Sequence, residues 1–209
     1  IDEIYKKDIQ KRITIRNRTV FDAVMKYLIN NFGATTSLTN LVDDLGKAGI
    51  RIKRETLNRY ITILKDAKIL CECNRFDLKS RRSIGGEQKY YLTDLGFYFA
   101  FNTDNRINYG PALENAVYVY ARTHGYSASI GRIGSLECDF ILRRGDADYA
   151  YAQVAMSMMS DKSTEDREYT PLERIRDNYP KFILTRDHST ADYGGIRHIN
   201  AVRWLLGEE

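Results

Sequence analysis

Three short stretches decide the fold expected for the second half of the chain: Leu113-Glu114-Asn115, Glu137-Cys138-Asp139-Phe140 and Ala152-Gln153-Val154-Ala155. Each places an acid or an amide inside an apolar run that is typical of regular structure. The first lies on a predicted helix, and the other two lie on successive predicted strands. We therefore expect Glu114, Asp139 and Gln153 to gather at one place in a mixed α/β sheet.

The elements around these stretches predict one domain over residues 95–209. A short helix is expected at 95–101, and a longer helix carries Glu114 and ends at Gly125. The expected elements after that helix are strands over 127–133, 136–143 and 149–154, a helix over about 164–177, strands over 181–185 and 196–199, and a short helix at 204–206. Alternation along the strand over 136–143 predicts that Glu137, Asp139 and Ile141 share one face.

This arrangement is typical of metal-assisted phosphodiester hydrolysis. Glu114 and Asp139 could hold Mg²⁺ through carboxylate oxygens, with the amide oxygen of Gln153 as a further ligand and Glu137 as a third carboxylate. Such a metal activates a water molecule and screens the phosphate. The structural alternative makes Glu114 a salt-bridge or packing partner and Asp139 a hydrogen-bonded buried acid.

The three stretches resemble the metal-binding frame of PD-(D/E)xK nucleases, and that resemblance implies a charge-stabilising lysine two residues after Gln153, where this chain has Ala155. Lys181, on a neighbouring predicted strand, is the candidate substitute. Loss of one transition-state donor costs about 10²–10³ in rate. We therefore expect a weak or inactive nuclease site.

The first 94 residues predict a winged helix-turn-helix domain. Apolar residues at helical spacing predict helices over about 20–28, 38–45 and 57–64, with Ser37 as the N-cap of the second. Residues 1–16 are expected to form a lead-in helix. A strand over 69–76, a basic loop over 79–86 and a returning strand over 89–92 then form the wing.

Basic and polar side chains lie on the expected outer face of the third helix and in the wing. They are Arg51, Lys53, Arg54, Asn58, Arg59 and Thr62 on and before the helix, and Lys79, Arg81 and Arg82 in the wing. Duplex DNA is the partner that this distribution favours, with Asn58 and Arg59 near base edges and the other cations on phosphates. The alternatives are a protein-docking module or a solvated basic face.

The charge distribution supports two domains with different partners. Residues 1–94 hold 19 Lys/Arg against 12 Asp/Glu, and residues 95–209 hold 13 against 16. No apolar run approaches the roughly 20 residues that span a bilayer. The three cysteines suit reduced thiols, and we expect a cytoplasmic protein. The chain starts at Ile1, which is the start expected of a fragment.

Short motifs along the whole chain resemble one family. They are Asp8-Ile9, Ile15-Arg16-Asn17, Leu113-Glu114-Asn115-Ala116-Val117, Glu137-Cys138-Asp139-Phe140, Gln153-Val154, Thr164 with Arg167-Glu168, Pro171-Leu172, and Ile175-Arg176-Asp177-Asn178-Tyr179-Pro180-Lys181. The chain is similar to the C-terminal region that follows the ATP-binding core of prokaryotic AAA-type ATPases. The resemblance implies a winged helix followed by a PD-(D/E)xK nuclease-like domain, with an ATPase core upstream.

Three functions remain open at this point. The favoured one is a DNA-binding or partner-docking module of a AAA-type ATPase, with an inactive nuclease-like domain. The chain has no Gly-x-x-x-x-Gly-Lys-Ser/Thr phosphate loop, so ATP would bind the upstream core and not this region. The first alternative is an Mg²⁺-dependent DNA endonuclease, and the second is a protein–protein adaptor.

Overall fold

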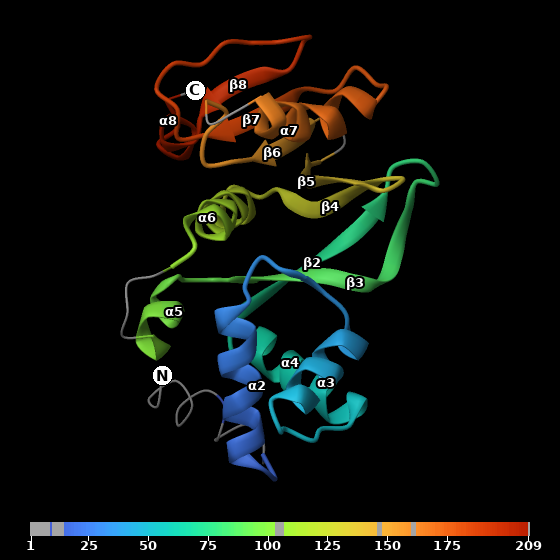
Figure 1. The fold of residues 1–209 in the computed structure, drawn as a ribbon, viewed down its shortest axis with the longest axis vertical. Coiled ribbons are helices and arrows are strands. Elements are labelled where there is room, and N and C mark those ends of the chain that lie inside the picture. The colour runs from blue at the N-terminus through green and yellow to red at the C-terminus, as the bar shows by residue number, and fades with distance from the viewer. Residues whose placement is uncertain (1–8, 10–14, 103–106, 146–147, 160–161, 209) are drawn as a thin grey trace. The chain divides into compact units, whose positions relative to one another are not determined.

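The computed structural model describes residues 9, 15–102, 107–145, 148–159 and 162–208, except for the side chain of residue 84. The lead-in helix expected over 1–16 lies almost entirely outside the described residues. The fold is mixed α+β with a large mixed sheet, and its hydrogen-bonded strand order is β1-β3-β2-β4-β5-β6-β7-β8 (Figure 1). The chain divides into two compact units, one of residues 1–72 and 86–107 and one of residues 73–85 and 108–209.

Three helices build the first unit: α2 (Arg18–Asn30), α3 (Leu38–Lys47) and α4 (Arg54–Asp66). The predicted N-cap of α3 is confirmed, because the Ser37 hydroxyl accepts a hydrogen bond from the Asn40 amide at 3.1 Å. Each helix buries its apolar stripe, and Phe21, Leu41 and Leu57 are at most 1% exposed. The short helix α5 (Gly96–Phe101) packs against α2.

A long hairpin follows α4 and contributes to both units. Its strands are β2 (Leu70–Asp77) and β3 (Arg82–Leu92). The tip is a turn over 78–81, so the basic loop and the returning strand expected over 79–86 and 89–92 have the wrong bounds. Residues 73–85 group with the second unit, whereas the boundary expected at 94/95 would place the whole hairpin in the first. The two-residue strand β1 (Thr35–Thr36) pairs antiparallel with β3.

The second unit is a mixed sheet with helices packed against it. Its strands are β4 (Ser127–Ile133), β5 (Leu136–Arg144), β6 (Asp148–Val154), β7 (Lys181–Thr185) and β8 (Arg197–Asn200), together with the distal part of β2. The pairs β4–β5 and β5–β6 are antiparallel, and β2–β4, β6–β7 and β7–β8 are parallel. The helices are α6 (Tyr109–Thr123), α7 (Lys162–Arg174) and α8 (Ala201–Leu205).

A β-bulge in β5 overturns the strict alternation expected over 136–143. The pairing with β4 shifts by one residue between Ser129↔Ile141 and Gly131↔Cys138. Two residues of β5 therefore oppose one residue of β4, and Cys138 and Ile141 enter the same core cluster. Phe140 instead meets Tyr118 of α6, with ring centroids 6.1 Å apart. The bulge lies at Asp139 and changes the surroundings of the acid that the sequence singles out.

Helix α7 covers the sheet face that carries this cluster. Leu172 and Tyr169 of α7 pack with Tyr151 of β6 and Ile183 of β7. Burial raises the pKa of the Cys138 thiol in the cluster, so the thiol stays protonated and is a core residue. Among the described residues no helix is both long and apolar enough to cross a membrane.

Candidate functional site

The structure brings Glu114 and Ala155 to one hollow of about 410 Å³, which we name the carboxylate pocket. Glu114 comes from α6, and Ala155 follows directly after β6. The first half of α7 closes the hollow with Arg167 and Glu168. The helix Glu and the residue in the lysine position thus lie at the same site, as the spacing of the motifs predicts.

Asp139 and Gln153 lie beneath this pocket and are both 8% exposed. The Asp139 carboxylate accepts a hydrogen bond from the Val154 amide at 2.9 Å. The Gln153 side-chain oxygen accepts from the Asp139 amide at 3.2 Å, and its nitrogen donates to Glu168 at 2.8 Å. The backbone donor and the carboxylate acceptor fix the orientation of the Gln153 amide, because the opposite orientation would leave both unsatisfied.

Arg167 supplies the positive charge at the carboxylate pocket. Its guanidinium donates to the buried Glu168 carboxylate at 2.7 and 3.1 Å, while its own side chain is 73% exposed. Glu168 therefore has an amide on one oxygen and a guanidinium on the other. This buried acid is satisfied by its own neighbours.

The residues present do not fit a divalent metal ion. The Gln153 oxygen, which was expected to be a ligand, is turned to a backbone amide. The expected third carboxylate, Glu137, is paired instead with Arg75. Among the described residues no group of three or more His, Cys, Asp or Glu side chains could hold a metal. The oxygen of Gln153 and the carboxylate of Glu137 are thus engaged by protein donors.

Lys181 does not replace the missing lysine. Its ammonium group donates to the backbone carbonyls of Ile175 and Asp177, at 2.6 and 3.3 Å. These carbonyls follow the C-terminal end of α7, where a cation is favourable. Lys181 is absent from the lining of the carboxylate pocket. The Lys181 ammonium group is thus held at the end of α7 and not at the carboxylate pocket.

A polar network borders the carboxylate pocket where β6, β7 and β8 end. The Ser157 hydroxyl donates to Asp187 at 2.6 Å, and Thr185 contacts His198 at 2.8 Å. Burial lowers the pKa of His198, although the Asp187 carboxylate opposes the shift. Burial of Asp187 raises its pKa, but hydrogen bonds from Ser157 and the Met158 amide outweigh it and leave the pKa lowered. His198 is therefore neutral in the folded protein near pH 7.

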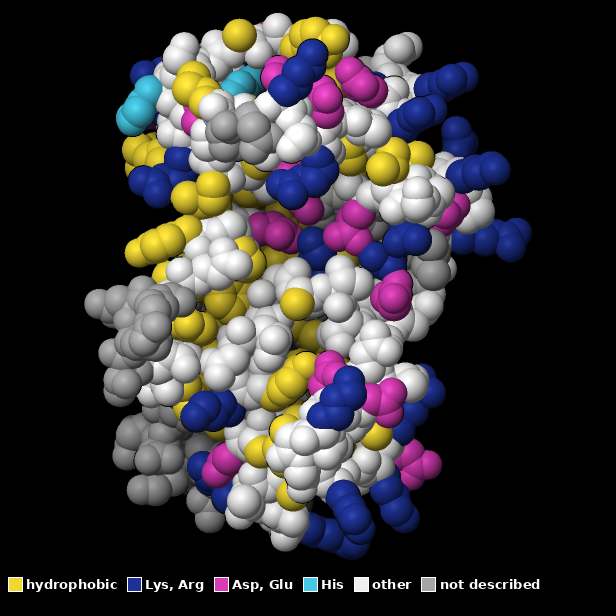
Figure 2. All heavy atoms as spheres, in the orientation of Figure 1, with side chains coloured by type: hydrophobic (Ala, Val, Ile, Leu, Met, Phe, Trp, Pro, Cys, Tyr) yellow, Lys and Arg dark blue, Asp and Glu magenta, His cyan; other side chains and the backbone are white. Residues whose placement is uncertain are grey.

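The residues predicted on the third helix all lie on the solvent side of α4 and the turn before it. The exposed set is Arg51, Lys53, Arg54, Asn58, Arg59 and Thr62. The opposite stripe, which includes Leu57 and Tyr60, is buried. Lys and Arg side chains project from the end of this unit near α3 and α4 (Figure 2). The predicted contact residues are thus exposed to solvent in the described part of the chain.

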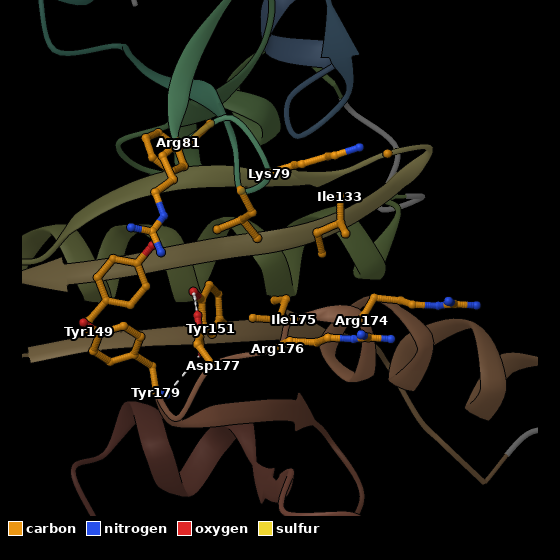
Figure 3. Close-up of a pocket in the computed structure, with 13 residues that line it drawn as sticks. Lys79, Arg81, Ile133, Tyr149, Tyr151, Arg174, Ile175, Arg176, Asp177 and Tyr179 are labelled. Atoms are coloured by element: carbon orange, nitrogen blue, oxygen red, sulfur yellow. Dashed lines mark hydrogen bonds between the residues drawn. The ribbon is translucent and has the colours of Figure 1, made fainter.

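The residues predicted to lie in a wing separate into two environments. Arg82 begins β3 and is exposed. Lys79 and Arg81 line a larger hollow of the second unit together with tyrosines of β6 and cations near the end of α7 (Figure 3). Inspection of the sequence alone missed this hollow. The sequence feature that could have indicated the hollow is the alternation along β6, which places Tyr149 and Tyr151 on the same face as Gln153.

Comparison with known proteins gives two uncharacterized relatives. One, from Haemophilus influenzae, is 27% identical over 206 residues, which cover 98% of this chain and 50% of the relative. The other, MJ1544 of Methanocaldococcus jannaschii, is 27% identical over 126 residues, which cover 60% of this chain and 28% of the relative. The chain thus spans half or less of the length of each. No solved structure matches.

The family comparison covers nearly all of the first unit and the hairpin segment 73–85 of the second. A domain family described as a domain of unknown function, DUF8612, matches residues 1–106. This match includes the exposed face of α4 and the entire β2–β3 hairpin. The chain belongs to the DUF8612 family.

Proposed function

We propose that this chain is a duplex-DNA-binding module of a longer protein. The observation that carries the proposal is the exposed basic face of α4, in a unit of three helices followed by a hairpin. This order supports a winged helix-turn-helix, in which the third helix enters the major groove. Asn58 and Arg59 then face base edges, and the cations around them bind phosphates.

The N-terminus of α4 adds an energetic argument for this role. Lys53 occupies the N-cap position with no side-chain capping hydrogen bond, and Arg54 is the first helical residue. Cations near a helix N-terminus oppose the helix dipole and cost about 0.3–1 kcal/mol each. A phosphate bound there would reverse this penalty, since it accepts from the free amides and pairs with both cations. Glu55 in the same turn offsets part of this cost, and the two cations beside it suit an anionic partner.

The second unit serves this module as a scaffold with an inactive nuclease-like site. Its α-β-β-β-α-β order and the placement of Glu114 beside Ala155 support a PD-(D/E)xK-like fold. The hydrogen bonds of Gln153 and Asp139 to backbone amides support an inactive site, because both groups already serve the fold. The relatives are at least twice as long as the matched region, which leaves room for the ATPase core that the motifs imply.

The test is binding of a fluorescently labelled duplex of mixed sequence, followed by anisotropy over a range of salt concentrations. Arg54→Ala should weaken binding and lower the slope of log affinity against log salt by about 0.9, because one phosphate is no longer neutralised. The matched control is Lys26→Ala, which removes the same charge from an exposed position on α2. Equal weakening in both variants, or no duplex binding at low salt, would refute the proposal.

A second variant separates affinity from folding. Lys53→Ser introduces a capping hydroxyl at a residue whose backbone is already extended, with φ −79° and ψ 145°. The new cap should stabilise the protein by about 1 kcal/mol and weaken duplex binding at the same time. A variant that is more stable and binds equally well would show that phosphates do not use this helix end.

The endonuclease alternative is tested with supercoiled plasmid and Mg²⁺ or Mn²⁺. The wild-type chain should nick plasmid no faster than the Asp139→Ala variant. Cleavage above that background, abolished in Asp139→Ala and in Glu114→Gln, would restore the enzymatic function. A contaminating nuclease would cleave equally in the wild type and in both variants. Loss of cleavage in both variants therefore assigns the activity to this site.

A further inference from the structure

The hollow of Figure 3 belongs to the second unit, and the proposals above give it no ligand of its own. Its volume is about 840 Å³, within the range of roughly 300–1,000 Å³ found for small-molecule sites. The hairpin turn lines it on one side. The start of β6 and the segment after α7 line the other. We name it the aromatic–basic pocket.

Three tyrosines form its aromatic wall. The rings of Tyr149 and Tyr179 are tilted by 40°, with centroids 4.6 Å apart, and Tyr149 meets Tyr151 edge-on at 5.3 Å. Tyr179 is 49% exposed, so ring surface remains open to a ligand. A planar aromatic group would stack on this surface.

The only acid among the described lining residues, Asp177, already accepts hydrogen bonds from the protein. The Asp177 carboxylate accepts from the Tyr151 hydroxyl at 2.5 Å and from the Tyr179 amide at 3.2 Å. Together these bonds fix the tyrosine wall to the end of α7. Asp177 is thereby a structural acceptor that holds the aromatic residues in place.

Four cations surround the wall: Lys79 and Arg81 on the hairpin turn, and Arg174 and Arg176 at and after the end of α7. All four are exposed. Within the described part of the chain, no side chain forms a hydrogen bond or an ion pair with the guanidinium groups of Arg81, Arg174 or Arg176. Lys79 interacts with Asp77, whose pKa is lowered chiefly by the Ser80 amide and by Lys79 to a lesser extent.

Arg81 also holds a backbone conformation that is costly for its residue type. Its φ is 55°, in the left-handed region that glycine adopts most easily. Asp77 fixes the turn by accepting a hydrogen bond from the Ser80 amide at 2.5 Å. A strained arginine at the tip of a turn, aimed at a cationic hollow, is a pattern associated with binding sites.

We propose that the aromatic–basic pocket binds a nucleotide, with the base stacked on the tyrosines and the phosphates on the arginines. Arginine forks match phosphate oxygens, and base–tyrosine stacking tolerates any base. An acidic peptide would use the cations but leave the ring faces unused. The nucleotide unit can come from a free nucleoside polyphosphate or from a single strand.

The experiment measures binding of four probes to the full chain by calorimetry in metal-free buffer: ATP, inorganic tripolyphosphate, adenosine and single-stranded oligothymidine. Arg81→Gly should weaken ATP binding about tenfold while thermal stability is kept, because glycine relieves the left-handed strain. Tyr179→Ala should weaken ATP about tenfold and leave tripolyphosphate unchanged. Arg186→Ala is the control, since this exposed arginine is outside the pocket.

The remaining outcomes are decisive in either direction. Binding of the strand but not of ATP, with the same dependence on Arg81 and Tyr179, supports the pocket and assigns the strand as its source. Equal binding of tripolyphosphate and ATP, with Tyr179→Ala without effect, overturns the proposal in favour of nonspecific anion attraction. Absence of saturable binding for both ATP and the strand also overturns it. Arg54→Ala should leave ATP binding unchanged, which separates this result from the test of α4.

Discussion

The carboxylate pocket and the aromatic–basic pocket lie at opposite ends of α7 on the second unit, and their polar groups behave in opposite ways. At the first, Gln153, Glu168 and Arg167 satisfy one another through short hydrogen bonds. At the second, the arginines form no such bonds with described residues, and the one lining acid is bound to a tyrosine. Gln153 and Glu168 are thus paired within the protein, while the arginines of the aromatic–basic pocket remain exposed.

The largest expected effect is the loss of the buried amide at the carboxylate pocket. Gln153→Leu removes the donor to Glu168 and the acceptor for the Asp139 amide, both inside the protein. Buried groups left unpaired should lower the free energy of unfolding by about 3 kcal/mol. Chemical denaturation with urea measures this change.

The paired variant Gln153→Leu/Glu168→Leu distinguishes this mechanism from simple loss of packing. With the carboxylate removed as well, no buried charge is left without its amide partner, and part of the stability should return. If Glu168→Leu lowers the free energy of unfolding as much in the Gln153→Leu background as in the wild type, the two side chains do not satisfy each other.

A smaller effect is expected on acidification, at the same end of the sheet. The pKa of His198 lies below its usual value of 6.5, so the unfolded chain binds its proton more readily than the folded protein does. Stability should therefore fall as the pH drops through about 6.5. Thermal unfolding between pH 8 and 5, a window above the titration of Asp187, measures this loss. In His198→Gln the profile should be flatter, and an unchanged slope would remove His198 as its cause.

The smallest effect is expected at the aromatic–basic pocket. Arg174→Ala and Arg176→Ala remove exposed side chains without a described partner, so each should change the free energy of unfolding by no more than about 0.5 kcal/mol. Urea denaturation of these two variants and of Gln153→Leu, measured side by side, compares their free energies of unfolding. A decrease of more than about 2 kcal/mol in either variant would show that these cations support the fold, and the difference between the two pockets would disappear.

The sequence predicts the helices and strands of this protein well because their signals are local. The stripe of Leu57, Tyr60 and Ile61 and the cap at Ser37 act within one turn of helix. The convergence of Glu114 and Ala155 also follows from the order of elements. The bulge at Asp139 could not be predicted, because it depends on the register between two strands.

The partners of individual side chains could not be predicted from the sequence either. Lys181 could be placed on a strand next to β6, but its choice of α7 carbonyls depends on where that helix ends. The same is true of Glu137, whose partner Arg75 is 62 residues away in the chain. The aromatic–basic pocket is formed by the hairpin turn, β6 and the segment at the end of α7, so no single sequence motif predicts it.

The shared β2–β3 hairpin determines how this protein can be divided. A fragment that ends at residue 94 would keep the distal hairpin but lack β4, the strand that pairs with Arg75 and Phe76. A fragment that starts at residue 95 would lack the hairpin side of the sheet and both hairpin cations of the aromatic–basic pocket. Neither unit is therefore encoded by one continuous segment. Limited proteolysis should yield two fragments that stay associated after a cut within the hairpin turn.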